Sequence, residues 1–310
     1  MRKLLFIFLF CLLTIPAFSQ IEEYQEDTMD VVELTDTLSE EDYSWLFGDE
    51  EDDVLYEEET GPSAGMILLQ ILLALIPALV LIFYVVWRDR LHPEPGGQLV
   101  KAFFMGFLTI PLALLFASLI GQIFMLLPPI EGVGALLVTS LMQAAIPEES
   151  AKLLILWLFL RRCRHFDEHM DGIVYAVCVG MGFATVENIL YVTGSGPQFL
   201  KVLSVGLSRA FLSIPGHFAF AVIMGYFYSL ASFKGKQTHR KYMLMAWGFP
   251  VLAHALYDFL LFVMDAYPNS MWHMLLMMLF FGSFFYMQQL GTRSIAKALS
   301  HDTPPHISDQ

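Results

Sequence analysis

Two adjacent glutamates, Glu148 and Glu149, lie within a stretch of otherwise mostly apolar residues, and Lys152 follows in the same stretch. An ionisable side chain at bilayer depth costs about 2.5–3.5 kcal/mol on insertion scales, so such residues are retained there mainly for function. Helical spacing places Glu148 and Lys152, four residues apart, on one face of a helix. The three charges therefore indicate chemistry or ion handling inside a membrane.

Further ionisable residues occur in the apolar stretches that follow. Glu187 and Asn188 are adjacent, His217 follows a Pro-Gly pair, and His254 and Asp258 are four residues apart and so share a helix face. Side chains on different helices at compatible depth can converge on one polar cavity. A glutamate can then act as a general base toward water, while imidazoles hold a metal ion or stabilise an oxyanion.

Each of these residues also has a simpler explanation when it is taken alone. A single intramembrane histidine commonly hydrogen-bonds to a neighbouring helix, Lys152 can neutralise a glutamate, and Asp258 can orient His254. Gly182 is best explained by close helix packing. Taken together, three glutamates, two histidines, one aspartate and one lysine predict a functional polar centre. The alternative from another class is a proton- or cation-coupled transporter or channel, since intramembrane acids also serve there.

The composition indicates which elements position these residues. Of the 310 residues, 56% are hydrophobic and 15% are charged, against about 25% charged in soluble domains. The sequence predicts an all-α polytopic membrane protein with about seven transmembrane helices and a polar site inside the bundle. A short surface or re-entrant helix is expected within residues 194–210. The seven apolar stretches, each near the ~20 residues that span a bilayer, are 66–87, 101–127, 134–160, 172–192, 211–233, 242–264 and 270–290.

The segment before the first apolar stretch has two parts. Residues 1–19 have a charged start, a short apolar core and the small-x-small sequence Ala17-Phe18-Ser19, as in a cleaved secretory signal peptide; an uncleaved helix is the alternative. Residues 20–63 are expected to form a disordered acidic tail, because positions 21–60 hold 18 Asp and Glu and no Lys or Arg. This tail accounts for the formal net charge of −14. Nucleic-acid binding is not expected, because no basic patch with interleaved aromatic residues is present.

The basic residues alternate between connections. The positive-inside rule makes the base-rich connections cytoplasmic, which predicts a cell-membrane protein with its N-terminal tail outside the cytoplasm and its C-terminus inside. A transmembrane domain is then expected over residues 64–292 and a cytoplasmic tail over 293–310. The bases of the inner connections and C-terminus are Arg88, Arg90, Lys101, Arg161, Arg162, Arg164, Lys234, Lys236, Arg240, Lys241, Arg293 and Lys297, and the outer connections hold only Lys201 and Arg209.

The polar motifs resemble those of the PrsW intramembrane proteases, relatives of the type II CAAX prenyl proteases. The resemblance rests on four motifs over residues 66–290: Glu148-Glu149-x-x-Lys152, Phe183-x-x-x-Glu187-Asn188, the in-helix His217, and His254-x-x-x-Asp258. The acidic tail is not part of the pattern.

This resemblance implies hydrolysis of peptide bonds within or at the edge of the lipid bilayer. The substrate would be a membrane-anchored protein, as with bacterial relatives that cut anti-sigma factors. It implies a catalytic set of Glu148, Glu149, Lys152, Glu187, His254 and Asp258, with Glu148 or Glu149 as the base and Asp258 orienting His254. Glu187, His217 and His254 would bind a divalent metal ion, expected to be zinc. A glutamate-activated water without metal fits the same residues.

Two other patterns are expected not to be catalytic. His165-Phe166-Asp167-Glu168-His169 matches H-x-x-E-H, but it occupies a short connection with no soluble domain to complete a zinc site. Gly194-Ser195-Gly196 could suggest a serine nucleophile, and a short connection explains it better.

Overall fold

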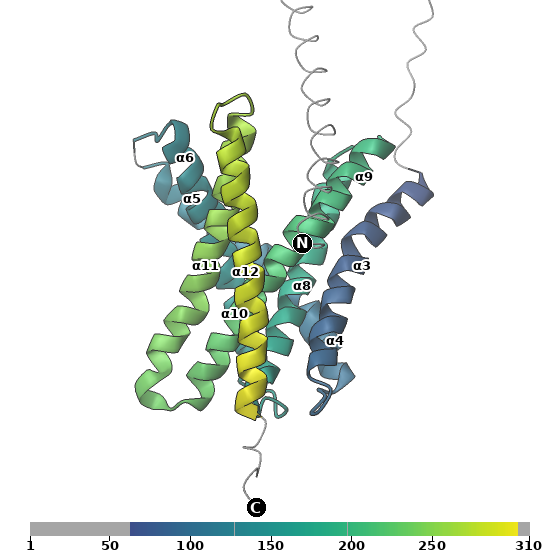
Figure 1. The fold of residues 1–310 in the computed structure, drawn as a ribbon, viewed down its shortest axis with the longest axis vertical. Helices are drawn as coiled ribbons and strands as arrows, with labels where there is room; N and C mark the ends of the chain where they lie inside the picture. Colours follow the sequence, from purple (N-terminus) through teal and green to yellow (C-terminus); the bar gives the residue numbers. More distant parts are fainter. Residues whose placement is uncertain (1–62, 127, 197, 303–310) are drawn as a thin grey trace, which may run out of the picture. The chain divides into compact units, whose positions relative to one another are not determined.

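The structure is a computed structural model, and it describes residues 63–126, 128–196 and 198–302. All regular secondary structure in this part of the chain is helical (Figure 1). The predicted signal peptide and nearly all of the predicted acidic tail lie outside the described residues. The elements are α3 (Ala64–Arg88), α4 (Gly96–Phe107), α5 (Thr109–Phe124), α6 (Gly132–Val138), the π-helix η1 (Thr139–Ala145), α7 (Ile146–Leu160), α8 (His169–Gly194), α9 (Phe199–Ser208), the π-helix η2 (Arg209–Ser213), α10 (Ile214–Phe233), α11 (Lys236–Ala266) and α12 (His273–Asp302).

Six of the helical segments in the described part are long and apolar enough to cross a membrane: 64–88, 96–124, 169–194, 199–233, 236–266 and 273–302. The predicted all-α, multi-pass architecture is confirmed, with six such segments against about seven expected. The remaining predicted span, 134–160, corresponds to α6, η1 and α7, which follow one another without a break. That segment carries Glu148, Glu149 and Lys152, and its three charges make it less apolar than the others.

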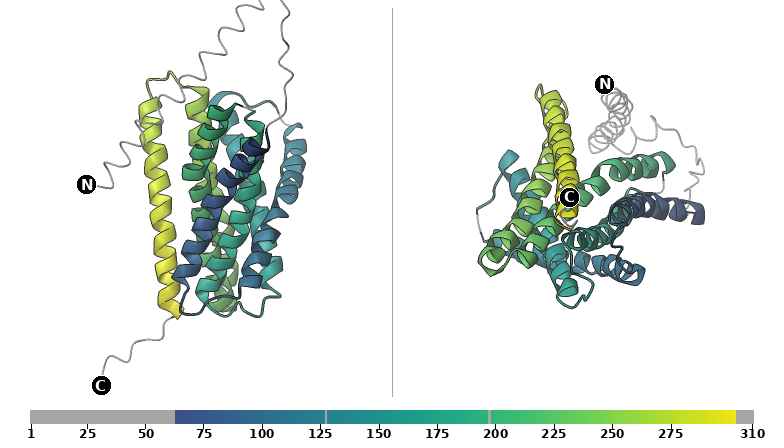
Figure 2. Two further views of the ribbon diagram at one scale, coloured as in Figure 1. Left: turned by 90° about the vertical axis from the view of Figure 1, so that its right-hand side faces the viewer. Right: turned by 60° about the horizontal axis from the view of Figure 1, so that its bottom comes forward.

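Helices α8 and α10 form the interior of the bundle. Nearly every residue of α8 from Met170 to Thr185 is buried, and α10 is buried on all sides over most of its length. A helix that is apolar all round is expected in such a position. Leucines and phenylalanines of α3, α5 and α12 instead point outward, as lipid-facing helices require. Figure 2 shows α12 along one side of the bundle.

Close backbone contact holds the two central helices together. A Cβ atom added to Gly225 of α10 would lie 2.3 Å from the carbonyl oxygen of Gly172 in α8. On the other side of α8, a Cβ atom added to Gly182 would lie 2.0 Å from the carbonyl oxygen of Phe103 in α4. Small residues permit this approach, which supplies van der Waals packing where lipid gives little hydrophobic driving force. The close-packing explanation for Gly182 therefore agrees with the structure.

Both π-helices end just before an Ile-Pro pair. Pro147 and Pro215 occupy the first turns of α7 and α10. Proline lacks an N–H donor and its ring clashes with the carbonyl four residues earlier, so a wider π turn relieves the conflict. Through η2, α9 continues into α10, so the short helix expected within residues 194–210 is not separate from the next span. Pro147 directly precedes Glu148, and Pro215 lies two residues before His217.

The C-terminal helix extends beyond the apolar stretch predicted from sequence. Helix α12 runs to Asp302, past the expected start of a tail at residue 293, because Gly291, Ile295 and Ala298 are buried against the bundle. Asp302 accepts hydrogen bonds from the backbone N–H groups of His169 (2.9 Å) and Met170 (2.8 Å). The end of α12 thereby caps the start of α8.

Candidate active site

Lys152 lies at the centre of the polar cluster. Its ammonium group donates hydrogen bonds to Glu149 Oε1 at 2.8 Å and Glu148 Oε2 at 3.2 Å, and it lies 3.3 Å from Nδ1 of His217. The same nitrogen lies 3.8 Å from the ring centre of Phe183. One cation thus joins the two glutamates of α7 to a histidine of α10.

His254 contributes a second link to the same carboxylates. Its Nδ1 lies 2.9 Å from Glu149 Oε1, and its Nε2 lies 3.2 Å from Asp258 Oδ2 and 3.9 Å from Glu148 Oε2. Phe220 stacks on the imidazole, with ring centres 5.0 Å apart and an interplanar angle of 19°. The contact with Asp258 places this carboxylate where it can orient His254.

The contacts of His217 determine its tautomer. A lysine ammonium has three donors and no acceptor, so the His217 Nδ1 that faces Lys152 must carry a lone pair. The proton then resides on Nε2, which donates to Glu187 Oε2 at 2.9 Å. The lone pair of His217 is therefore directed toward Lys152 and the glutamates of α7, as a metal ligand or general base requires.

Arg209 belongs to this site, although the sequence analysis placed it in an outer connection. Its Nη2 donates to Glu187 Oε2 at 2.8 Å and to Ser213 Oγ at 3.2 Å, and its Nε donates to Asn188 Oδ1 at 2.7 Å. The guanidinium lies over the ring of Tyr191, 3.8 Å from its centre. The sequence did offer one signal for Arg209, a basic residue just before a predicted span at the depth of Glu187. The π-helix that turns Arg209 inward has no simple sequence pattern.

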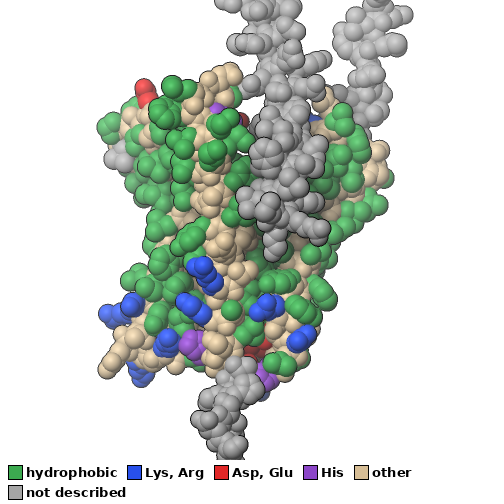
Figure 3. All heavy atoms as spheres, in the orientation of Figure 1, with side chains coloured by type: hydrophobic (Ala, Val, Ile, Leu, Met, Phe, Trp, Pro, Cys, Tyr) green, Lys and Arg blue, Asp and Glu red, His purple; other side chains and the backbone are tan. Residues whose placement is uncertain are grey.

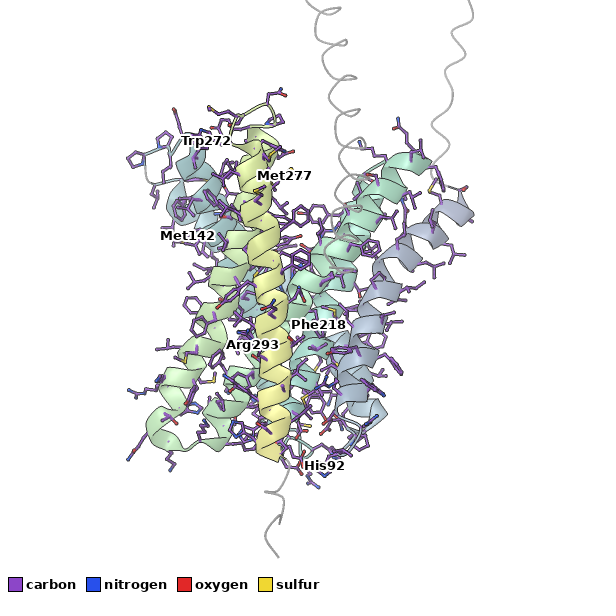
Figure 4. All side chains as sticks on the ribbon, in the orientation of Figure 1. His92, Met142, Phe218, Trp272, Met277 and Arg293 are labelled. Atoms are coloured by element: carbon purple, nitrogen blue, oxygen red, sulfur yellow. The ribbon has the colours of Figure 1, made fainter. Side chains whose placement is uncertain are left out.

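The cluster is buried at one end and reaches solvent-accessible surface at the other. The side chains of Glu149, Lys152, His217 and His254 are 0–5% exposed, whereas those of Glu148, Glu187, Arg209 and Asp258 are 16–17% exposed. Phe218, the neighbour of His217, lies about midway along the bundle, between the end with His92 and the end with Trp272 (Figure 4). The site therefore lies at intramembrane depth.

The donor atoms fit a divalent metal ion. One ligand atom each from Glu148, Glu149, His217 and His254 all lie within 4.8 Å of one another. The second oxygen of Glu149 is buried and has no hydrogen-bond partner among the described residues.

The structure therefore brings together all the residues that the sequence analysis selected. Glu187 lies beside this four-atom group, and its Oε2 is engaged by His217 and Arg209. The contact set is consistent with a carboxylate–histidine pair that orients an imidazole ligand.

The two patterns that were expected not to be catalytic make their contacts outside the polar cluster. In the H-x-x-E-H sequence, Glu168 contacts His92 and caps α8, and Nδ1 of His169 lies 3.0 Å from Asp302. Ser195 Oγ donates to the carbonyl oxygen of Val192 at 2.7 Å. Neither group joins the polar cluster.

Comparison with known proteins agrees with this site. The sequence model of the family described as PrsW family intramembrane metalloprotease matches residues 94–286, a range that contains every residue of the cluster. No solved structure matches the chain.

This chain aligns with most of the length of several curated relatives named Protease PrsW. The relative from Clostridioides difficile (strain 630) is 39% identical over 194 residues, 62% of this chain and 79% of the relative. The relative from Bacillus subtilis (strain 168) is 34% identical over 224 residues, 72% of this chain and 93% of the relative. The relative from Geobacillus kaustophilus (strain HTA426) is 30% identical over 196 residues, 63% of this chain and 80% of the relative. This multi-pass membrane protein is a peptidase and belongs to the PrsW family of intramembrane metalloproteases.

Proposed function

We propose that this protein hydrolyses peptide bonds of membrane-anchored proteins with a water molecule activated by Glu148. The observation that carries the proposal is the difference between the two adjacent glutamates. Glu149 is fully buried and its Oε1 is held by Lys152 and His254, whereas the Glu148 side chain is 17% exposed and its Oε2 lies 3.2 Å from Lys152 and 3.9 Å from His254. Of the two, Glu148 is the glutamate that we assign to the water molecule, because it is the more exposed, while Glu149 is fixed by two partners.

His217, His254 and Glu149 are the residues that we propose to hold the metal ion, and zinc is the ion that best suits two imidazoles and a carboxylate. When bound, such an ion supplies Lewis-acid polarisation of the scissile carbonyl. Glu187, the carboxylate that the sequence analysis assigned to the ion, would instead act by holding His217 through Nε2. Asp258 would hold His254 in the same way.

The remaining steps belong to the chain's own residues. Glu148 accepts a proton from water as the water oxygen forms a bond to the scissile carbonyl carbon. Glu148 then delivers that proton to the amide nitrogen as the carbon–nitrogen bond breaks, leaving a carboxyl group and an amine. Lys152 keeps both glutamates in place through its contacts with their carboxylates.

The depth of the site supports a substrate held in the membrane. A cluster midway along a bundle of membrane-crossing helices is accessible to a peptide within or at the edge of the bilayer. An anti-sigma-factor-like protein with one membrane span is a substrate of this type. Because the chain belongs to a peptidase family, the transporter alternative is set aside.

Metal removal tests the proposal. Purified full-length protein in lipid vesicles, mixed with a single-span substrate, should contain about one zinc ion per chain and lose cleavage on chelation. Zinc should restore cleavage, and a His217→Ala, His254→Ala variant should contain no zinc. Chelated, zinc-free protein that still cuts at the full rate would contradict the metal assignment.

A further inference from the structure

A cavity of about 390 Å³ lies at one end of the bundle, and no residue of the polar cluster lines it. Helix α4, the end of α7 and the connection to α8 form its walls. The connection leads to Glu168, which contacts His92, so the cavity lies at the end of the bundle that Figure 4 marks with His92. Its lining residues are Gln98, Lys101, Met105, Leu158, Phe159, Arg162, Cys163, Arg164 and His165.

The cavity carries positive charge without a counterion. Lys101, Arg162 and Arg164 line it, and no carboxylate does. Within the described residues, the lysines and arginines that form ion pairs are Lys152 and Arg209. Figure 3 shows lysine and arginine side chains gathered toward this end of the molecule. Three unpaired cations around one hollow suit an anion.

Part of the cavity wall is apolar. Met105, Leu158 and the buried ring of Phe159 line it, and the Lys101 ammonium lies 5.7 Å from the centre of that ring. Outward-pointing side chains of the same helices, Phe104 and Trp157, are 56% and 40% exposed, as is typical of a lipid-facing surface. The cavity thus combines basic and apolar lining residues at the end of the membrane-crossing segments.

We propose that this cavity binds the phosphodiester headgroup of an anionic phospholipid, with part of an acyl chain along the apolar wall. Basic pockets between membrane helices commonly hold such headgroups. The arginines would contact phosphate oxygens, and Lys101 would lie between the phosphate and the ring of Phe159. The apolar wall favours a lipid over free phosphate, because a phosphate ion would leave that wall uncovered.

Cys163 provides a direct readout, since it lines the cavity and is partly exposed, whereas Cys178 is buried. A full-length Cys11→Ser, Cys178→Ala variant has Cys163 as its single cysteine. Labelling of this thiol by an uncharged maleimide would be followed in detergent with phosphatidylglycerol, phosphatidylcholine or inorganic phosphate. We expect phosphatidylglycerol to slow labelling about tenfold relative to phosphatidylcholine, and inorganic phosphate to have little effect. Equal rates with both lipids, or equal protection by inorganic phosphate, would overturn the proposal.

Two variants separate this cavity from general attraction of lipid to basic residues. Each base near a lipid surface contributes roughly fivefold in affinity, so Arg162→Gln with Arg164→Gln should raise the phosphatidylglycerol concentration that gives half-maximal protection by about 25-fold. The matched control, Lys236→Gln with Arg240→Gln, removes two exposed bases outside the cavity and should keep full protection. Protection lost equally in both, or in neither, would contradict a specific site. Leu158→Trp, which fills the apolar wall without changing charge, should also reduce protection in protein whose melting temperature is unchanged.

Discussion

Lys152 determines much of the geometry of the site. The three N–H donors of a lysine ammonium match its three partners, Glu148, Glu149 and His217. The sequence predicted that Lys152 and Glu148 share a helix face. It did not predict that Glu149 joins His254, because that contact depends on how α7 and α11 are packed and rotated. Residue types and depths were thus predictable from sequence, whereas the pairing was not.

Arg209 is the residue that sequence reasoning did not select. Its position between two apolar stretches placed it in an outer connection, yet the π-helix η2 turns it toward Glu187 and Asn188. Through Glu187, Arg209 fixes the Nε2–H of His217 and directs the Nδ1 lone pair to the opposite side. Arg209 is therefore a positioning residue, because it acts through Glu187.

Removal of Arg209 should weaken metal binding before it affects folding. Loss of a residue that orients a metal ligand typically lowers metal affinity by about 10–100-fold. We expect a loss of this size for Arg209→Gln in chelator-competition titrations with zinc, and a smaller loss for Arg209→Lys, which keeps a donor for Glu187. Lys201→Gln removes an exposed base from the same connection and serves as the control. Unchanged zinc affinity in Arg209→Gln would show that Glu187 does not depend on the guanidinium.

At the scale of the helices, close packing around α8 positions Glu187. A Cβ atom at Gly182 would lie 2.0 Å from the Phe103 carbonyl oxygen, whereas one at Gly248 of α11 would have no atom within 4 Å. Gly182→Ala should lower the unfolding free energy by about 1–3 kcal/mol through overpacking. Gly248→Ala should be neutral or stabilise the protein by up to about 1 kcal/mol, because alanine favours helix. Thermal unfolding in detergent measures both, and equal melting temperatures would contradict the packing described for α4 and α8.

The turn after α3 should make stability depend on pH. Burial, reinforced by Glu94, Glu168 and Asp302, raises the pKa of Asp89 to about 7. Between about pH 4 and pH 7 the folded chain therefore binds more protons at this site than the unfolded chain, so stability falls as pH rises. Asp89→Asn should melt at a higher temperature than the unaltered protein at pH 8, with a difference that shrinks toward pH 5. Glu131→Gln, at an exposed position, should show no such trend; a pH-independent difference for Asp89→Asn would contradict the assignment.

At the scale of the whole molecule, the apolar stretches gave the order of the spans. The ends of the helices were harder to predict than their order. Helix α12 continues to Asp302 because small and apolar residues pack against the bundle and Asp302 caps α8, a long-range contact that local composition does not indicate. The segment 134–160 was expected as a span although its charges make it the least apolar, and those charges belong to the site.

The orientation of the chain remains a prediction from its basic residues. Accessibility labels at Thr60 and Gln310 should be found on opposite sides of the membrane, with Thr60 outside the cytoplasm, because the base-rich connections are expected inside. Impermeant cysteine labelling in intact and opened cells measures this directly. Both labels on the same side would contradict the topology and the outer position expected for the acidic tail.

The two glutamates of α7 should differ in what their loss removes. Glu149→Gln should reduce both zinc content and cleavage, because Glu149 contacts His254 and offers a buried free oxygen. His165→Ala and Ser195→Ala should cut at nearly the rate of the unaltered protein, because neither residue joins the cluster.

The most direct test of the account is the cleavage rate of Glu148→Gln, measured together with its zinc content. Purified Glu148→Gln protein in vesicles with a single-span substrate should keep its zinc and its melting temperature. Cleavage should fall by about 10²–10⁴-fold, because an amide cannot accept the proton from water. A Glu148→Gln protein that retains zinc and cuts at the rate of the unaltered protein would contradict glutamate-activated water as the mechanism.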